Sequence, residues 1–102
     1  MNQTPEIDIH EAKKRIDAGD LLLDVREQDE YDEAHIPGST LIPLSEFANR
    51  YDEVPQDREV VVYCRSGKRS AQAVNFLNDK GYDAINVEGG ILAWQEADYP
   101  TE

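Results

Sequence analysis

Residues 59–70 of the chain read Glu-Val-Val-Val-Tyr-Cys-Arg-Ser-Gly-Lys-Arg-Ser. The first five, Glu59 to Tyr63, are rich in β-branched and aromatic side chains, which predicts a strand covered on both of its faces. A helical pattern follows from Ser70 to Lys80, with apolar side chains at helical spacing and Gly81 after the last turn. Cys64 is therefore expected at the carboxyl end of a buried strand, where α/β proteins position their chemistry.

The remainder of the chain alternates between short helical and short strand patterns. Asp8 and Glu11 form a capping-box pattern in front of a helix over residues 9–18, and Gly19 ends that helix. Further helices are expected at residues 29–34, 45–50 and 91–97, and further strands at residues 21–25, 40–42 and 84–87. This alternation predicts one α/β domain over residues 4–99, with a largely parallel sheet and helices on both faces.

The charge and composition of the chain exclude several classes of protein. Its 102 residues include 10 Lys or Arg and 22 Asp or Glu, which gives a formal charge of −12. Such an acidic field opposes non-specific binding to nucleic acid or to an anionic membrane. No apolar stretch approaches the length of a membrane span, and the amino terminus has neither a basic cluster nor an apolar run, so a cytoplasmic protein is expected. One cysteine cannot form an internal disulfide, and zinc-type spacings of Cys and His are missing, so we expect neither a metal nor a cofactor.

The segment after Cys64 is basic in an otherwise acidic protein. Arg65, Lys68 and Arg69 place three of the 10 basic side chains within five residues of the thiol. Gly67 permits a tight turn, and a short loop that leads into a helix can direct successive backbone N–H groups toward one anion. These surroundings favour thiolate over thiol and predict that the pKa of Cys64 lies below its usual value of about 8.5. The sequence therefore predicts a nucleophilic cysteine in an anion-binding loop.

Other conspicuous side chains have structural interpretations. His10 is expected on the surface of the first helical turn, and neither His10 nor His35 lies in a pattern that marks a general base. The acidic residues 27–33 are typical of a solvated helix face, and Ile91 and Trp94 are typical of a core. A lone cysteine is most often a small buried apolar residue, but the basic loop argues against that interpretation of Cys64.

The sequence resembles that of a single-domain rhodanese over nearly its whole length. The resemblance is carried by Asp24–Arg26, Glu30–Tyr31, His35–Gly38, Cys64–Ser70, Glu88–Gly90 and Trp94. It implies a five-stranded, mainly parallel sheet flanked by helices, with sulfur transfer through an enzyme persulfide. It also implies that Asp24 and Arg26 are mainly structural. Ala34 stands where glycine is common and Gln28 where proline is common, and neither departure touches the cysteine loop.

The residues and the resemblance agree on a two-step reaction. The Cys64 thiolate attacks a small anionic sulfane donor such as thiosulfate and then passes the sulfur to a thiol or cyanide-like acceptor. The residues expected to bind the donor are Arg65, Ser66, Gly67, Lys68, Arg69 and Ser70. Among them Arg69 is expected to lie closest to the donor, because it stands where the loop meets the helix.

Three alternatives remain open at this point. A cysteine phosphatase or arsenate reductase would need arginine at position 70, where this chain has Ser70. A binding module would use the same fold without catalysis. A sulfur relay would accept its sulfur from a partner protein, and thiosulfate would then be only a laboratory donor.

Overall fold

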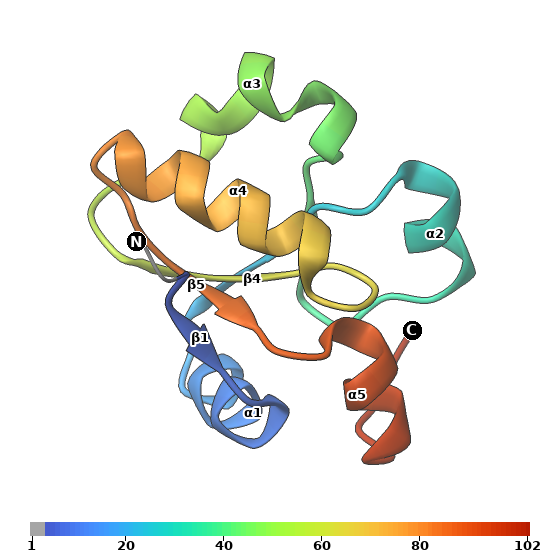
Figure 1. Ribbon diagram of the computed structural model, residues 1–102. Coiled ribbons are helices and arrows are strands. Elements are labelled where there is room, and N and C mark those ends of the chain that lie inside the picture. Colours follow the sequence, from blue (N-terminus) through green and yellow to red (C-terminus); the bar gives the residue numbers. More distant parts are fainter. Residues whose placement is uncertain (1–3) are drawn as a thin grey trace.

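The computed structural model describes residues 4–102 and contains one sheet of five strands in the order β1-β5-β4-β2-β3 (Figure 1). The strands are β1 (Glu6–Ile7), β2 (Leu21–Asp24), β3 (Thr40–Leu41), β4 (Glu59–Tyr63) and β5 (Asp83–Val87). All four pairings between neighbouring strands are parallel. The carboxyl ends of β2, β4 and β5 therefore meet at the same edge of the sheet, which confirms the predicted parallel α/β architecture.

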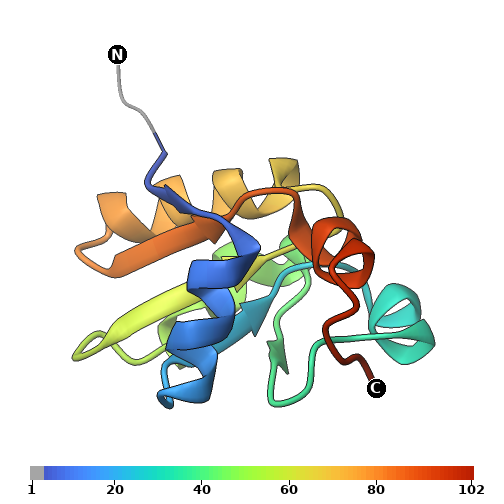
Figure 2. The same cartoon turned by 90° about the horizontal axis from the view of Figure 1, so that it is seen from below.

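Helices cover both faces of the sheet (Figures 1 and 2). They are α1 (Ile9–Asp17), α2 (Gln28–Glu33), α3 (Phe47–Arg50), α4 (Lys68–Asp79) and α5 (Gly90–Glu96), with short 3₁₀ turns at Leu44–Glu46 and Tyr51–Glu53. Within residues 4–102, no helix combines the length and the apolar character needed to cross a bilayer.

The side chains of β4 alternate between two apolar clusters. Val60 and Val62 belong to the cluster on the α3 and α4 side, whereas Val61 and Tyr63 belong to the cluster on the α1 and α5 side. All four are fully buried. Successive side chains of a strand point to opposite faces, so a strand between two helical layers needs apolar residues at every position. The run of three valines supplies them.

Three features of the elements differ from the sequence-based prediction. The helix expected over residues 45–50 is a 3₁₀ turn, Leu44–Glu46, followed by the four-residue helix α3. Strand β1 was not expected, because a two-residue edge strand carries no periodic pattern. Helix α4 begins at Lys68 rather than at Ser70, because Gly67 adopts a φ of +104° and caps the helix there. Lys68 and Arg69 therefore lie in the first turn of α4 and not in the loop.

A buried ion pair connects the end of β2 to the segment that follows α2. The Asp24 carboxylate accepts hydrogen bonds from the Arg26 backbone N–H at 2.8 Å and from its guanidinium at 2.8 and 3.1 Å. The same guanidinium donates to the carbonyl of Ala34 at 2.7 Å and lies over the ring of Tyr63. The Asp24 side chain is fully buried and the Arg26 side chain is 6% exposed. These contacts fix the chain between β2 and β3 against β4.

We expect Asp24→Asn to lower the free energy of unfolding by about 3 kcal/mol, because it leaves a buried guanidinium without its counter-charge. Urea denaturation measures the loss. The matched control is Asp17→Asn, which removes the exposed partner of Lys13 on α1 and should cost less than about 1 kcal/mol. Equal losses of unfolding free energy in the two variants would show that the buried pair stabilises the fold no more than the exposed pair does.

Candidate active site

Cys64 directly follows β4, and its sulfur faces the start of α4. The residue is only 1% exposed. Its Sγ nevertheless accepts a hydrogen bond from the backbone N–H of Gly67 at 3.1 Å and one from the hydroxyl of Ser70 at 3.2 Å. The sulfur is thus buried but hydrogen-bonded by polar donors, so Cys64 is not a purely apolar core residue.

The start of α5 holds the backbone of the cysteine loop in place. The backbone N–H of Ile91 donates to the carbonyl of Cys64 at 2.9 Å, and that of Leu92 donates to the carbonyl of Arg65 at 3.2 Å. Gly90 has a φ of +56°, and a Cβ there would lie 2.4 Å from the Cys64 carbonyl oxygen. Only glycine permits this approach. These two hydrogen bonds from α5 fix the carbonyls of Cys64 and Arg65. The backbone N–H groups of Ser66 and Gly67 act on the sulfur instead.

The pKa of Cys64 is lowered, as predicted, although burial alone would raise it. The largest influence is burial, which disfavours the thiolate. The Ser70 hydroxyl and the backbone N–H groups of Ser70, Gly67 and Ser66 outweigh it, because each stabilises a negative charge on the sulfur. Directed hydrogen bonds are therefore the main cause of the shift, whereas the sequence-based prediction also relied on the basic side chains.

The hydroxyl of Ser70 connects the sulfur to a buried amide. Ser70 Oγ lies 2.5 Å from Asn86 Oδ1, and Asn86 Nδ2 donates to the Gly67 carbonyl at 3.1 Å and to Glu6 Oε2 at 2.9 Å. A hydroxyl has one hydrogen and cannot donate it fully to two acceptors. The thiol form can donate its own hydrogen to Ser70, which then donates to Asn86. A thiolate has no hydrogen to donate, so it competes with Asn86 Oδ1 for the hydrogen of Ser70.

The sequence-based prediction missed Asn86. A signal was present, because Asn86 is a polar residue inside a predicted strand and is fully buried in β5. Buried polar side chains need hydrogen-bond partners, and here those partners belong to the cysteine site.

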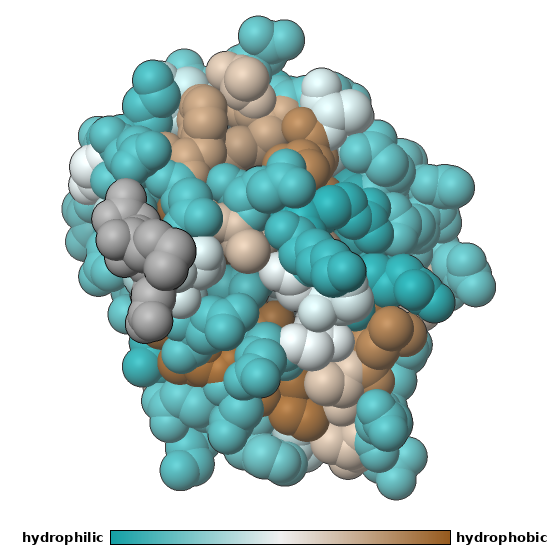
Figure 3. Space-filling view, viewed as in Figure 1, coloured by the Kyte–Doolittle hydropathy of each residue, from teal (hydrophilic) through white to brown (hydrophobic). Residues whose placement is uncertain are grey.

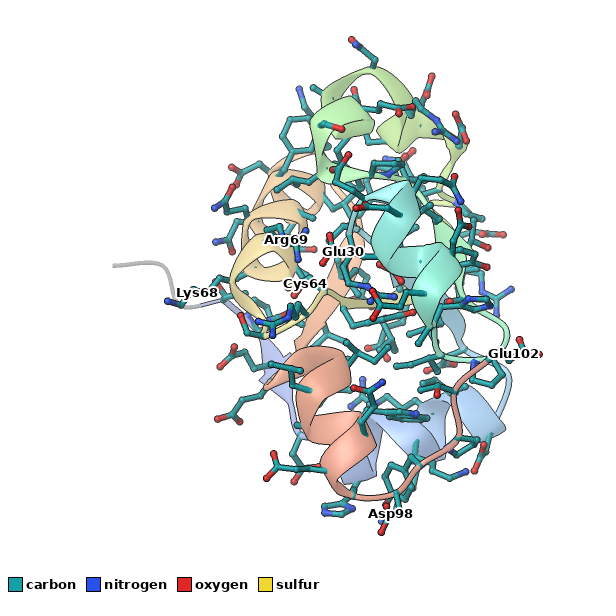
Figure 4. All side chains as sticks on the ribbon, turned by 90° about the vertical axis from the view of Figure 1, so that its right-hand side faces the viewer. Glu30, Cys64, Lys68, Arg69, Asp98 and Glu102 are labelled. Carbon is teal, nitrogen blue, oxygen red and sulfur yellow. The ribbon has the colours of Figure 1, made fainter. Side chains whose placement is uncertain are left out.

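Arg69 does not project freely toward the sulfur. Its guanidinium donates two hydrogen bonds to the carboxylate of Glu30, at 2.7 and 2.8 Å, and Figure 4 shows both side chains beside Cys64. The ion pair with Arg69 holds the pKa of Glu30 at about 2. The expectation that Arg69 lies closest to the donor stays a prediction, and the structure adds that a carboxylate already pairs with this guanidinium. The predicted solvated face over residues 27–33 is wrong at Glu30.

The remaining predicted residues occupy simpler positions. Arg65 and Lys68 are exposed, and within residues 4–102 neither forms an ion pair. His35 stacks on Tyr31 with ring centroids 3.8 Å apart, and His10 lies on the surface with its Nδ1 2.7 Å from the hydroxyl of Tyr99. Neither histidine hydrogen-bonds to the cysteine, in agreement with the structural roles expected. Ile91 and Trp94 are buried core residues, as predicted.

Comparison with known proteins agrees with this geometry. Residues 8–97 match the family model of the rhodanese-like domain. The chain belongs to the rhodanese family. The resemblance read from the sequence is thereby confirmed, and the five-stranded parallel sheet is the one that this resemblance implied.

Two relatives and one solved structure resemble this rhodanese domain closely. A sulfurtransferase from Allochromatium vinosum is 41% identical over 98 residues, which cover 93% of this chain and 92% of the relative. The putative sulfur carrier protein YrkF from Bacillus subtilis is 40% identical over 88% of this chain, which spans 50% of that longer protein. The crystal structure of a rhodanese-related protein from Thermoplasma volcanium has a TM-score of 0.91 and 37% identity, covering 96% of this chain and 97% of the other. The chain is thus a member of the rhodanese-like sulfurtransferase family.

Ser70→Ala should raise the pKa of Cys64, because it removes the hydroxyl that stabilises the thiolate. The alkylation rate by iodoacetamide, measured from pH 5 to 10, should shift to higher pH and fall severalfold at pH 7. Ser66→Ala is the matched control, since only the backbone N–H of Ser66 acts on the sulfur. A profile for Ser70→Ala that coincides with wild type would contradict the assigned hydrogen bond.

Glu30→Gln should lower stability in a pH-dependent manner. The folded-state pKa of Glu30 is about 2 against an ordinary 4.5, so its contribution is complete above about pH 4.5 and is lost as the pH falls toward 2. Because both partners are partly exposed, we expect a loss of about 1 kcal/mol at pH 7. Urea midpoints of wild type and variant should converge between about pH 5 and pH 2. A constant difference over this interval would show that the ion pair does not stabilise the fold.

Proposed function

We propose that this rhodanese domain transfers sulfane sulfur through a persulfide on Cys64. The observation that carries the proposal is the position of Sγ, which is buried but hydrogen-bonded by Gly67 and Ser70 at the start of α4. The lowered pKa of Cys64 provides a nucleophile without a separate general base. Relatives named sulfurtransferase support this class of reaction.

The proposed reaction has two displacement steps. The Cys64 thiolate attacks the outer sulfur of thiosulfate, an S–S bond forms to the enzyme, and the bond to the sulfonate sulfur breaks. Sulfite leaves with the bonding electron pair, and the negative charge remains on the outer sulfur of the persulfide. A thiolate or cyanide then attacks that outer sulfur, and Cys64 leaves as thiolate.

The groups that lower the pKa of the thiolate are also suited to hold the persulfide. A terminal sulfur added to Cys64 extends the negative charge outward by one atom, toward the backbone N–H groups of residues 65–69. These dipoles are fixed before the reaction, so they need no reorganisation as charge moves. Exposed Arg65 and Lys68 add attraction for an anionic donor at the entrance.

A protein can replace thiosulfate as the sulfur source in the same mechanism. The relative named as a putative sulfur carrier supports a place for this chain in sulfur relay. The Cys64 chemistry is unchanged in that case, because a protein persulfide also presents an outer sulfur to the thiolate. A cysteine phosphatase fits less well, because Ser70 stands at the position where that chemistry requires arginine.

Incubation of the protein with thiosulfate should add one sulfur atom, detected as intact mass under non-reducing conditions. Cys64→Ser should gain none, because the alcohol is not ionised near neutral pH. A thiol or cyanide should then remove the added sulfur and restore the original mass. An adduct of equal amount on Cys64→Ser, or hydrolysis of an aryl phosphate in place of sulfur loading, would refute the proposed function.

A further inference from the structure

Two of the cationic side chains near Cys64 form ion pairs with carboxylates. Asp24 pairs with Arg26, and Glu30 pairs with Arg69 through both terminal guanidinium nitrogens. The protein as a whole carries a formal charge of −12. The basic appearance of the cysteine segment in the sequence therefore overstates the positive charge that a donor meets.

Glu30 comes from α2, 39 residues before Arg69 in the chain, and reaches the first turn of α4 (Figure 4). This bidentate ion pair occupies the two terminal N–H groups of the guanidinium that Arg69 could otherwise donate to an anionic donor. The charge of Cys64 also acts on Arg69, so the pair lies within electrostatic reach of the sulfur. A donor anion must therefore share Arg69 with Glu30 and approach the Glu30 charge, and the repulsion grows with the charge of the donor.

A cavity of about 240 Å³ lies beside the cysteine loop and has a mainly polar lining with a smaller apolar part. Arg65 and Glu30 line it together with Ile91 and Leu92 of α5. Leu92 is the one large apolar side chain of residues 4–102 that is exposed, at 39%. Figure 3 shows apolar surface over α5 with hydrophilic surface beside it. The apolar part of this lining can contact the organic group of a donor, and Glu30 and Glu33 add two carboxylates that disfavour a second negative charge on it.

We propose that Glu30 determines donor specificity by neutralising Arg69, so that the site selects organic sulfane donors with one negative charge over the thiosulfate dianion. The organic group of such a donor occupies the cavity beside Arg65 and Leu92. The inference rests on the proposed persulfide chemistry of Cys64 and narrows its substrate class.

Organic thiosulfonates, R–SO₂–S⁻, are the probes that isolate this effect. The Cys64 thiolate attacks their terminal sulfur, the bond between that sulfur and the sulfonyl sulfur breaks, and the sulfinate R–SO₂⁻ leaves with the electron pair. The terminal sulfur keeps its negative charge as the persulfide, and no proton is transferred. Methanethiosulfonate thus delivers the same atom as thiosulfate but carries one charge instead of two.

The experiment measures kcat/KM for both donors with wild type, Glu30→Gln and two controls. Glutamine keeps the length of Glu30 and can still accept from the backbone N–H of Glu27, so the capping contact of α2 is retained. Glu30→Gln should raise kcat/KM about tenfold for thiosulfate and about threefold for methanethiosulfonate, because the relief of repulsion scales with donor charge. The ratio between the two donors should therefore change by about threefold.

The controls separate local charge from general effects. Asp29→Asn removes one charge from the neighbouring exposed position of the same helix and should change both donors by less than about twofold. Glu30→Asp keeps the charge but disturbs the contact, and it should leave the donor ratio close to that of wild type. Because Glu30→Asp shares any loss of packing with Glu30→Gln, a ratio change confined to Glu30→Gln supports the charge effect.

A third donor tests the cavity. Wild type should use benzenethiosulfonate better than methanethiosulfonate, and Leu92→Ser should reduce the ratio of the two kcat/KM values. An equal ratio in wild type and Leu92→Ser would show that the organic group does not occupy this cavity.

The outcomes distinguish the two proposals. An unchanged or reversed donor ratio in Glu30→Gln, with sulfur still loaded onto Cys64, would overturn the role of Glu30 and leave the persulfide mechanism intact. Failure of every donor to load sulfur onto wild type would overturn the persulfide mechanism and the specificity inference with it.

Discussion

The buried sulfur of Cys64 can carry a negative charge only because hydrogen-bond donors converge on it. Removal of a thiolate from water is costly unless other dipoles replace the water. In this chain the backbone N–H of Gly67 and the hydroxyl of Ser70 replace it. Most other features near the site can be understood as means of holding those two donors. The positive φ of Gly67 starts α4 at the right place, Asn86 binds both the Ser70 hydroxyl and the Gly67 carbonyl, and α5 fixes the carbonyls that precede the turn.

Electrostatics near the site differ from those of the protein as a whole. The long-range field is acidic, whereas the sulfur is surrounded by fixed dipoles that favour an anion. Two cations near the site are balanced by the pairs Asp24–Arg26 and Glu30–Arg69, whereas Arg65 and Lys68 are exposed and form no ion pair within residues 4–102. In the proposed mechanism, oriented backbone groups at the sulfur act on the donor at short range and depend on geometry, whereas Arg65 and Lys68 act from the surface. Such an arrangement favours recognition of one small charged atom, such as a terminal sulfur, over attraction of highly charged ligands.

The parts of the fold that the sequence predicted are those with a dense local pattern. Three consecutive valines before Tyr63 predicted β4, and the basic segment after it predicted the site. Strand β1 was missed because Glu6 and Ile7 have no periodicity and become a strand only through pairing with β5. The Glu30–Arg69 pair was missed because it joins residues 39 positions apart, and a run of acidic residues otherwise looks like a solvated helix face. Asn86 could have been noticed as a polar residue in an apolar strand, but its partners follow only from the three-dimensional arrangement.

The hydroxyl hydrogen of Ser70 lies between the sulfur of Cys64 and the side chain of Asn86 in β5. When it turns from Asn86 toward Cys64, the Asn86 carbonyl oxygen loses a donor while the amide nitrogen keeps its contacts with Gly67 and Glu6. The hydrogen bonding of this amide is therefore expected to change when the thiol ionises. In nuclear magnetic resonance, the side-chain NH₂ signals of Asn86 would then report whether the sulfur is protonated, ionised or extended by an added sulfur atom. No label on the cysteine is needed.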